Sequence, residues 1–200
     1  MLVFVILMKL SGSYQIKLEK QKVWKALNDS DILKQAIPGC EEFTKKSDTE
    51  FTATATNKIG PFNATFTGDI ELKEIDAPNS YVIEGSGNSP VGFASGSAKV
   101  SLEDNNGGTK LSYTVEANVG GKIAQVGSRL IDMTAKKMSD IFFGKFSELI
   151  VLKNISREKK SKPESENIPQ KKSDTKYGEK ILIYSVVALV LLGILSYLIF

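Results

Sequence analysis

The period of the apolar residues changes once along this chain, and that change constrains the fold more than any other feature. From Leu10 to Val119, apolar and polar residues alternate in runs separated by turn sequences, as in antiparallel strands with one buried face. After Gly120-Gly121, apolar residues recur at helical spacing as far as Leu149. The sequence therefore predicts a sheet followed by one helix of about 30 residues.

The first strand is followed by two short helical segments rather than by a hairpin. Their apolar residues have helical spacing: Val23, Trp24 and Leu27 in the first, and Ile32, Leu33 and Ala36 in the second. Asp29 or Ser30 can cap the second helix, and Pro38-Gly39 ends it. The order of elements is then a strand, two short helices, about six strands and a long helix, which indicates the α+β class.

The segment between the expected strands Tyr81–Ser86 and Phe93–Leu102 is rich in Gly, Ser and Pro. Its glycines could suggest a phosphate cradle, but no Gly-Lys-Ser/Thr follows and the flanking segments are both strands. A flexible hairpin loop is therefore expected here.

The chain ends in an uncharged apolar stretch, residues 181–200. As a helix it would be about 30 Å long, the thickness of the hydrocarbon layer of a bilayer. Tyr184 and Tyr197 stand near its two ends, where aromatic side chains meet the membrane interface. A buried core helix is the alternative, but such helices rarely lack a polar face over this length. We expect a single-pass transmembrane tail anchor.

The preceding segment is polar and basic. Residues 151–180 contain nine Lys or Arg residues and five Asp or Glu residues. A lysine excess beside a membrane span favours a cytoplasmic location and attracts anionic headgroups, although a merely solvated linker has the same composition. The expected organisation is a domain at 8–152, a basic polar linker at 153–180 and the anchor at 181–200, in the cell membrane with the domain cytoplasmic.

Residues Met1–Leu7 are apolar but have neither a basic start nor a small-residue cleavage site, so they make a poor signal peptide. Translation could begin at Met8, or the extension could lengthen the first strand. The expected domain is counted from Met8.

The 200 residues include no histidine and a single cysteine, Cys40. Usual zinc sites, histidine general bases and Ser-His or Cys-His nucleophiles are therefore excluded. One cysteine forms no internal disulfide, in agreement with a reducing compartment. The net charge of +3 is too small to argue for nucleic acid. No metal or covalent cofactor is expected.

Four motifs occur in order along the domain: Trp24, Ile37–Cys40, Asn57–Phe62 and Gly121–Ile131. Together they resemble the carbon monoxide dehydrogenase CoxG family of the START/Bet v1-like (SRPBCC) superfamily. The resemblance implies a helix-grip fold, with a curved antiparallel sheet around the long C-terminal helix and a hydrophobic cavity between them. It also implies docking of a carbon monoxide dehydrogenase-type molybdenum hydroxylase at the membrane, with a quinone or other lipid as ligand.

The expected ligand-lining residues are inward-facing aromatics and apolar residues of the motif that opens the long helix: Trp24, Phe51, Phe62, Phe66, Phe93, Ile123, Val126, Gly127, Leu130 and Phe142. A filled core would use the same residues for packing. Two other functions remain open on this fold: a lipid-binding or transfer protein without a redox partner, and a polyketide cyclase-like enzyme. We expect no catalytic residues, because the strand patterns place nearly all carboxylates on outward faces.

Overall fold

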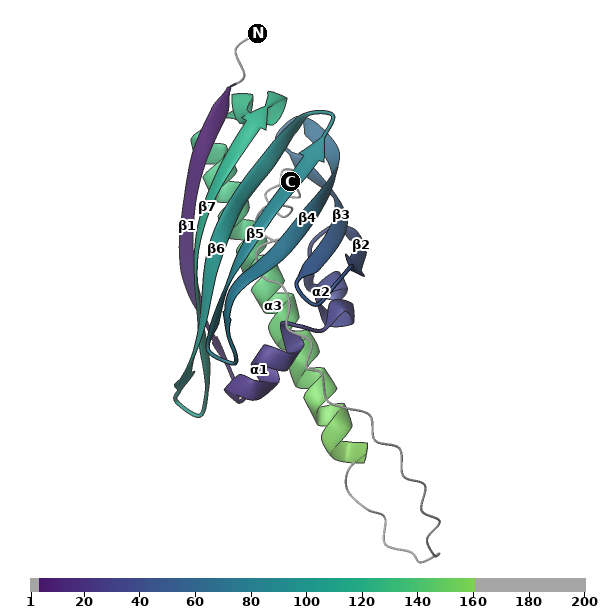
Figure 1. The fold of residues 1–200 in the computed structure, drawn as a ribbon, viewed down its shortest axis with the longest axis vertical. Coiled ribbons are helices and arrows are strands. Elements are labelled where there is room, and N and C mark those ends of the chain that lie inside the picture. Colours follow the sequence, from purple (N-terminus) through teal and green to yellow (C-terminus); the bar gives the residue numbers. More distant parts are fainter. Residues whose placement is uncertain (1–3, 161–200) are drawn as a thin grey trace, which may run out of the picture.

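The computed structural model describes residues 4–160 and contains one seven-stranded sheet (Figure 1). Its strands are β1 (Val5–Ile16), β2 (Cys40–Lys45), β3 (Glu50–Ile59), β4 (Phe62–Asp76), β5 (Ser80–Ser89), β6 (Gly92–Asn105) and β7 (Gly108–Gly121). The order across the sheet is β1-β7-β6-β5-β4-β3-β2, and every pairing is antiparallel. The expected sheet is thus confirmed.

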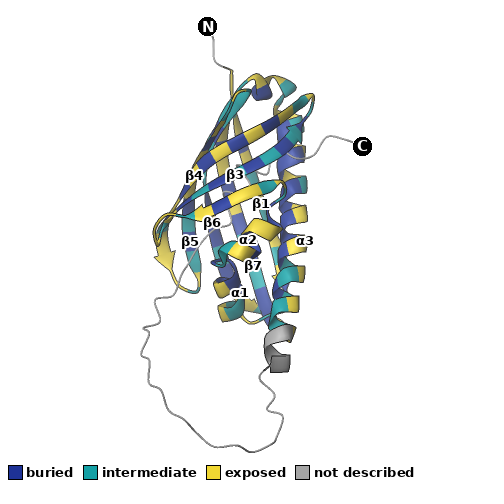
Figure 2. Ribbon diagram, turned by 90° about the vertical axis from the view of Figure 1, so that its right-hand side faces the viewer, coloured by how far each residue is buried: buried dark blue, intermediate teal, exposed yellow. Residues whose placement is uncertain are grey.

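The helices are α1 (Lys20–Ala26), α2 (Ser30–Ala36), the 3-10 helix η1 (Lys122–Val126) and α3 (Ser128–Lys160). Helix α3 runs along one face of the sheet, and α1 and α2 lie beside its later turns (Figures 1 and 2). We call the face that packs on α3 the inner face and the opposite one the outer face. This is the expected helix-grip arrangement.

Period-two alternation explains why one face of the sheet is buried. Along β3, Phe51, Ala53 and Ala55 are fully buried, while the threonines between them are partly exposed. The same alternation continues along β4, where Phe66 and Ile70 are buried (Figure 2). Burying one face of each strand against α3 supplies the hydrophobic stabilisation of the domain.

Local sequence also sets the ends of α2. The Asp29 carboxylate accepts hydrogen bonds from the backbone N–H groups of Asp31 and Ile32, both at 3.2 Å, so the predicted cap is confirmed. The chain reverses at Gly39, whose φ is +67°. A Cβ there would lie 2.2 Å from the carbonyl oxygen of Thr56, so only glycine fits this turn.

The expected loop between Tyr81–Ser86 and Phe93–Leu102 is wrong. Strands β5 and β6 pair through it residue by residue, with Gly85 opposite Gly96 and Ser86 opposite Ser95. Only a tight turn at 89–92 separates the two strands. Cross-strand hydrogen bonds and neighbouring strands on both sides compensate for the low strand propensity of glycine and serine.

The expected continuous helix from Gly121 is also interrupted. Residues Lys122–Val126 form η1, and Gly127, with φ of +92°, separates it from α3. Within α3, Met133 and Ile141 belonged to the predicted apolar stripe but are 61% and 39% exposed. Helix α3 continues to Lys160, so it extends past the expected domain end at Leu152 into the expected linker.

Strand β1 begins at Val5, and Val5, Ile6 and Leu7 pair with β7. Met8 is buried within this strand. The structure therefore agrees with the alternative in which the extension lengthens the first strand. The expected membrane span at 181–200 lies outside the described residues. Within residues 4–160, no helix has both the length and the apolar character needed to cross a bilayer.

The two ends of the molecule differ in the elements that form them. One end, which we call the hairpin end, contains the β3–β4 turn, the β5–β6 turn, η1 and the first turn of α3 (Figure 1). The backbone N–H of Ile123 in η1 donates to the carbonyl of Val91 at 3.1 Å, joining two of these segments. The opposite end contains α1 and the last turns of α3. Lys20 of α1 forms an ion pair there with Asp104 at 3.3 Å.

Candidate ligand-binding site

A band of small residues crosses the inner face of the sheet. Ala53, Gly68, Gly87 and Ala94 are in cross-strand register, and Gly85, Gly96 and Ala117 form the neighbouring row. We call these seven residues the small-residue band. Alanine and glycine fill less volume than the Phe, Ile and Leu side chains that flank them. Of the sheet's inner face, this band therefore leaves the most room for a ligand beside α3.

Five of the predicted ligand-lining residues are buried in the core. Trp24 lies in α1, Phe51 in β3, Phe66 in β4, Ile123 in η1 and Phe142 in α3, each 2% exposed or less. They belong to one apolar cluster that extends from α1 to η1. Burial in this cluster fits both a ligand-lining role and simple packing.

Three further predicted residues gather at the hairpin end. Phe62, Val126 and Leu130 are partly buried, and they come from β4, η1 and α3. A Cβ placed on Gly60 would lie 3.3 Å from Val126 and 3.7 Å from Leu130, so the β3–β4 turn packs directly on both side chains. These residues form an apolar rim where the sheet and α3 meet.

Gly127 has a conformational role that sequence spacing does not reveal. No atom lies within 4 Å of the position that its Cβ would take, so space is present there. Its φ of +92°, however, strains any residue with a side chain. A bulky substitution at Gly127 would disturb the junction of η1 and α3, whether or not a ligand lies nearby.

Phe93 does not face inward as expected. Its neighbour Ala94 is buried on the inner face, and Phe93 points to the outer face by strand alternation. Its ring covers Gly120 of β7, where a Cβ would lie 2.3 Å from the ring. Phe93 lines an outer hollow of about 370 Å³ with Phe4, Val91 and other residues of the hairpin end.

An aromatic cluster that the sequence did not single out joins the sheet to the middle of α3. The rings of Tyr14 and Phe143 stack with centroids 4.1 Å apart, and Tyr113 stacks on Phe143 at 5.5 Å. The Tyr14 hydroxyl donates to the carboxylate of Asp140. Burial and this hydrogen bond raise the pKa of Tyr14 above its ordinary value, so the hydroxyl keeps its proton. The signal was the alternation of Tyr14 with polar residues along β1.

Trp24 and Tyr81 form a second aromatic pair near α1. Their rings meet edge to face with centroids 5.3 Å apart, and both residues are almost completely buried. Neither the Trp24 Nε1 nor the Tyr81 hydroxyl has a hydrogen-bond partner within the part of the chain that the structure describes. Buried polar atoms normally have partners, so two orphaned groups side by side in the core suit a bound molecule or water that completes them.

Cys40 is unsuited to nucleophilic chemistry. Its thiol is half-buried and donates to the carbonyl of Glu42 at 3.3 Å. Burial raises the pKa of this thiol to about 11 in spite of the nearby Lys34, so the reactive thiolate is scarce at neutral pH. Among residues 4–160, no three His, Cys, Asp or Glu residues are grouped so that they could hold a metal ion.

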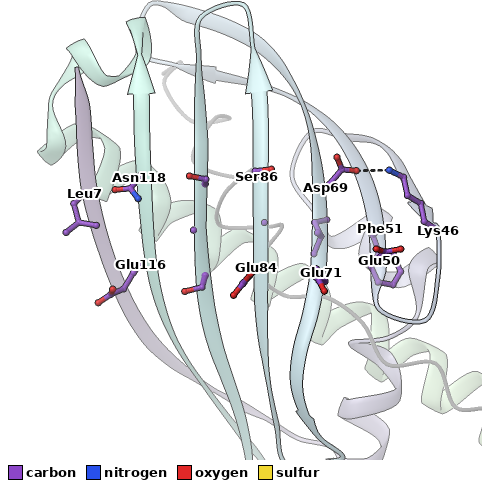
Figure 3. Close-up of a pocket in the computed structure, with 15 residues that line it drawn as sticks. Leu7, Lys46, Glu50, Phe51, Asp69, Glu71, Glu84, Ser86, Glu116 and Asn118 are labelled. Carbon is purple, nitrogen blue, oxygen red and sulfur yellow. Dashed lines mark hydrogen bonds and ion pairs between the residues drawn. The ribbon is translucent and has the colours of Figure 1, made fainter. Parts of the chain in front are cut away.

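The outer face of the sheet contains a shallow hollow of about 870 Å³ (Figure 3). Its carboxylates form surface ion pairs: Lys46 with Asp69 at 2.7 Å, and Lys73 with Glu84 at 2.5 Å and with Glu71 at 3.4 Å. Hydrogen bonds from Lys46 and Thr52 lower the pKa of Asp69. Such exposed pairs separate like charges on neighbouring strands and contribute little to stability.

A smaller hollow of about 430 Å³ lies between the α1–α2 turn and α3. At its edge Lys153 contacts Asp29 at 2.5 Å. Burial alone would raise the pKa of Asp29, but the hydrogen bonds from Lys153 and the Ile32 N–H hold it below the ordinary value. The pair thus fixes α3 to the cap of α2 and has a structural role.

The sequence profile of the carbon monoxide dehydrogenase CoxG family, described by the G component of that enzyme, matches residues 12–151. The chain belongs to this family. No protein with curated annotation matches the sequence. Membership in the CoxG family confirms the resemblance that the four motifs indicate, and the match covers the whole of the sheet except the first residues of β1.

Solved structures confirm the Bet v1-like fold of this CoxG family member. A conserved protein from Geobacillus kaustophilus is 29% identical with a TM-score of 0.69, covering 72% of this chain and 95% of its own. Ara h 8.0201 is 16% identical with a TM-score of 0.53, and the match covers 72% and 98% of the two chains. The Zhui aromatase/cyclase from Streptomyces sp. R1128 is 12% identical with a TM-score of 0.53, covering 72% and 94%. The last two similarities concern the fold alone.

Proposed function

We propose that this protein is a membrane-anchored accessory protein that holds a quinone or another lipid between its sheet and α3. It recruits a carbon monoxide dehydrogenase-type molybdenum hydroxylase to the membrane, where the held molecule accepts electrons. Family membership supports the partner. The observation that carries the ligand is the small-residue band together with the orphaned polar atoms of Trp24 and Tyr81.

Physical separation explains why such a protein is useful. A soluble dehydrogenase cannot reach a lipophilic acceptor dissolved in the bilayer, whereas a carrier beside it can cover the gap. Residues 161–180 join α3 to the apolar segment at 181–200. A flexible chain of that length has an r.m.s. span of about 25 Å, comparable to the width of a small domain. The anchor and linker thus keep the domain close to the membrane while leaving it free to turn.

The buried side chains favour a carrier over an enzyme. Among the described residues, the buried polar side chains are Asn28, Asn57, Thr109, Thr134 and Ser139. None of these is an acid or base that titrates near neutral pH, whereas a cyclase-like reaction requires one within the site. Burial also raises the pKa of Tyr113, which keeps that hydroxyl protonated. The polyketide cyclase-like alternative therefore has less support.

Co-purification tests the partner. The tagged full chain, isolated in mild detergent from its native membranes, should bring with it a protein that contains molybdenum. A variant truncated after Lys180 should leave both proteins in the soluble fraction. Recovery of lipid without any molybdenum protein would contradict the recruitment role and support the lipid-transfer alternative.

A further inference from the structure

The hairpin end is cationic and contains no carboxylate. Its segments 55–68, 85–98 and 117–131 include Lys58, Lys122 and Arg129, but no Asp or Glu. None of these three cations forms an ion pair within residues 4–160. Lys122 and Arg129 are exposed, and Lys58 is partly exposed. Their positive charge is therefore uncompensated.

The opposite end has a different character. Its lysines alternate with carboxylates and pair with them: Lys20 with Asp104 at 3.3 Å, Lys22 with Glu19 at 3.9 Å, and Lys153 with Asp29 at 2.5 Å. The two ends of the molecule thus differ in the balance of charge, although both contain several lysines. Only the hairpin end presents a surface of one sign.

Apolar side chains are exposed at the same end. Phe4 is 56% exposed and Val5 is 49% exposed, and Pro61 at the β3–β4 turn is also exposed. Phe4 and Phe93 line the 370 Å³ hollow together with Lys122. Exposed apolar groups beside unpaired cations are typical of surfaces that contact a lipid interface, where apolar groups enter the headgroup region and cations attract anionic phosphates.

We propose that the hairpin end binds the surface of an anionic phospholipid bilayer. Lys58, Lys122 and Arg129 face the phosphates, and Phe4 and Pro61 enter the headgroup layer. This contact would place the apolar rim of Phe62, Val126 and Leu130 next to the lipid. It rests on the proposed function and deepens it by naming the surface through which a bilayer ligand would enter.

The proposed tail permits this orientation. Helix α3, Ser128–Lys160, is about 50 Å long, so the chain leaves the described structure far from the hairpin end (Figure 1). Residues 161–180 can extend to at most about 70 Å. That length allows the anchor to enter the same bilayer on which the hairpin end lies.

The test uses the full chain with Cys40→Ser and one new cysteine labelled with the polarity-sensitive dye NBD. Gln125→Cys places the label in η1 at the hairpin end, and Glu103→Cys places a control label at the opposite end. Both residues are exposed. Each protein is reconstituted in vesicles of phosphatidylcholine, with or without phosphatidylglycerol, that contain a spin-labelled quencher lipid. We expect a blue shift and quenching at position 125 only in vesicles with phosphatidylglycerol, and neither effect at position 103.

Charge variants identify the responsible surface. The triple variant Lys58→Gln/Lys122→Gln/Arg129→Gln should weaken the contact about 100-fold, because each cation near an anionic surface contributes about 5-fold. The control Lys17→Gln/Lys25→Gln/Lys34→Gln removes the same charge from exposed positions outside the hairpin end and should retain the contact. If Lys58→Gln disturbs folding, the double variant of the two exposed cations should still lose about 30-fold.

Three results would overturn the inference: no quenching at position 125, equal quenching without phosphatidylglycerol, or full quenching in the triple variant. An acidic protein partner would give the first of these. Sedimentation of the vesicles separately reports the tail anchor, and quenching is measured whatever fraction sediments. A protein that sediments without quenching therefore contradicts this inference alone, while one that fails to sediment contradicts the proposed anchor.

Discussion

The hydroxyl of Tyr14 in β1 donates a hydrogen bond to the carboxylate of Asp140 in α3. Strand β1 is an edge strand, so this bond and the stacking of Tyr14 on Phe143 help to hold the edge against the helix. The space between sheet and helix depends on this attachment. Tyr14 thus links the position of α3 to the width of the candidate site.

Replacing Tyr14 with Phe should lower the free energy of unfolding by about 1 kcal/mol, because the ring stack remains and the hydrogen bond is lost. Asp140 is exposed, so water can replace the hydroxyl and limit the cost. Urea unfolding followed by the fluorescence of Trp24, the single tryptophan, measures the change. The control Ser13→Ala, on the exposed face of β1, should change the unfolding free energy by no more than about 0.5 kcal/mol. A variant as stable as the wild type would show that the bond does not hold α3.

Replacing Tyr81 with Phe should stabilise ligand-free protein by about 1 kcal/mol, because a buried hydroxyl without a partner is removed. In ligand-loaded protein, the same change should instead weaken retention of the ligand if the hydroxyl contacts it. Unfolding curves before and after delipidation separate the two effects. Destabilisation of the ligand-free protein would indicate that the hydroxyl has a partner in the protein.

The buried tyrosines predict a loss of stability at alkaline pH. Burial raises the pKa of Tyr81 above its ordinary value of 10.0, so the folded state keeps a proton that the unfolded chain releases. The contribution of Tyr81 is fully present below pH 10 and falls by at most about 1.4 kcal/mol per pH unit above it. Tyr81→Phe should therefore gain stability relative to wild type as pH rises from 10 to about 11. Parallel curves for the two proteins would contradict this.

Two glycine substitutions should have opposite effects. Gly39→Ala should destabilise the domain by about 1–3 kcal/mol, because φ is +67° and a Cβ would lie 2.2 Å from two oxygen atoms. Gly144→Ala, in the exposed part of α3 with open space around it, should stabilise by up to about 1 kcal/mol. Thermal melting of both variants measures the contrast, and equal shifts would argue against the turn geometry at Gly39.

Much of the fold follows from local patterns. The alternation in β3 and β4 predicts both the strands and their buried faces, and Asp29 predicts the start of α2. These predictions succeed because each depends on neighbouring residues. Long-range packing against α3 does not alter them.

The failures occur where the local signal is weak or is overridden. Around Phe93 small residues occupy both faces of β6, so alternation does not reveal which face is buried. The spacing of Val126 and Leu130 continues across Gly127, so the left-handed turn there is invisible in the apolar pattern. Met133 lies in the periodic stripe but remains exposed, because the sheet does not cover that part of α3.

The central claim is that a lipophilic molecule occupies the space between the sheet and α3. Ala94 is 2% exposed on the inner face, and its neighbour Ser95 points to the outer face. Mass spectrometry of an organic extract of the purified full chain, compared with Ala94→Leu and Ser95→Leu, tests the claim most directly. We predict a stoichiometric quinone or lipid in the wild type and in Ser95→Leu, and its loss from an Ala94→Leu protein that remains folded. No such molecule in the wild type, with Ala94→Leu destabilised by about 1–3 kcal/mol as in a filled core, would contradict the account.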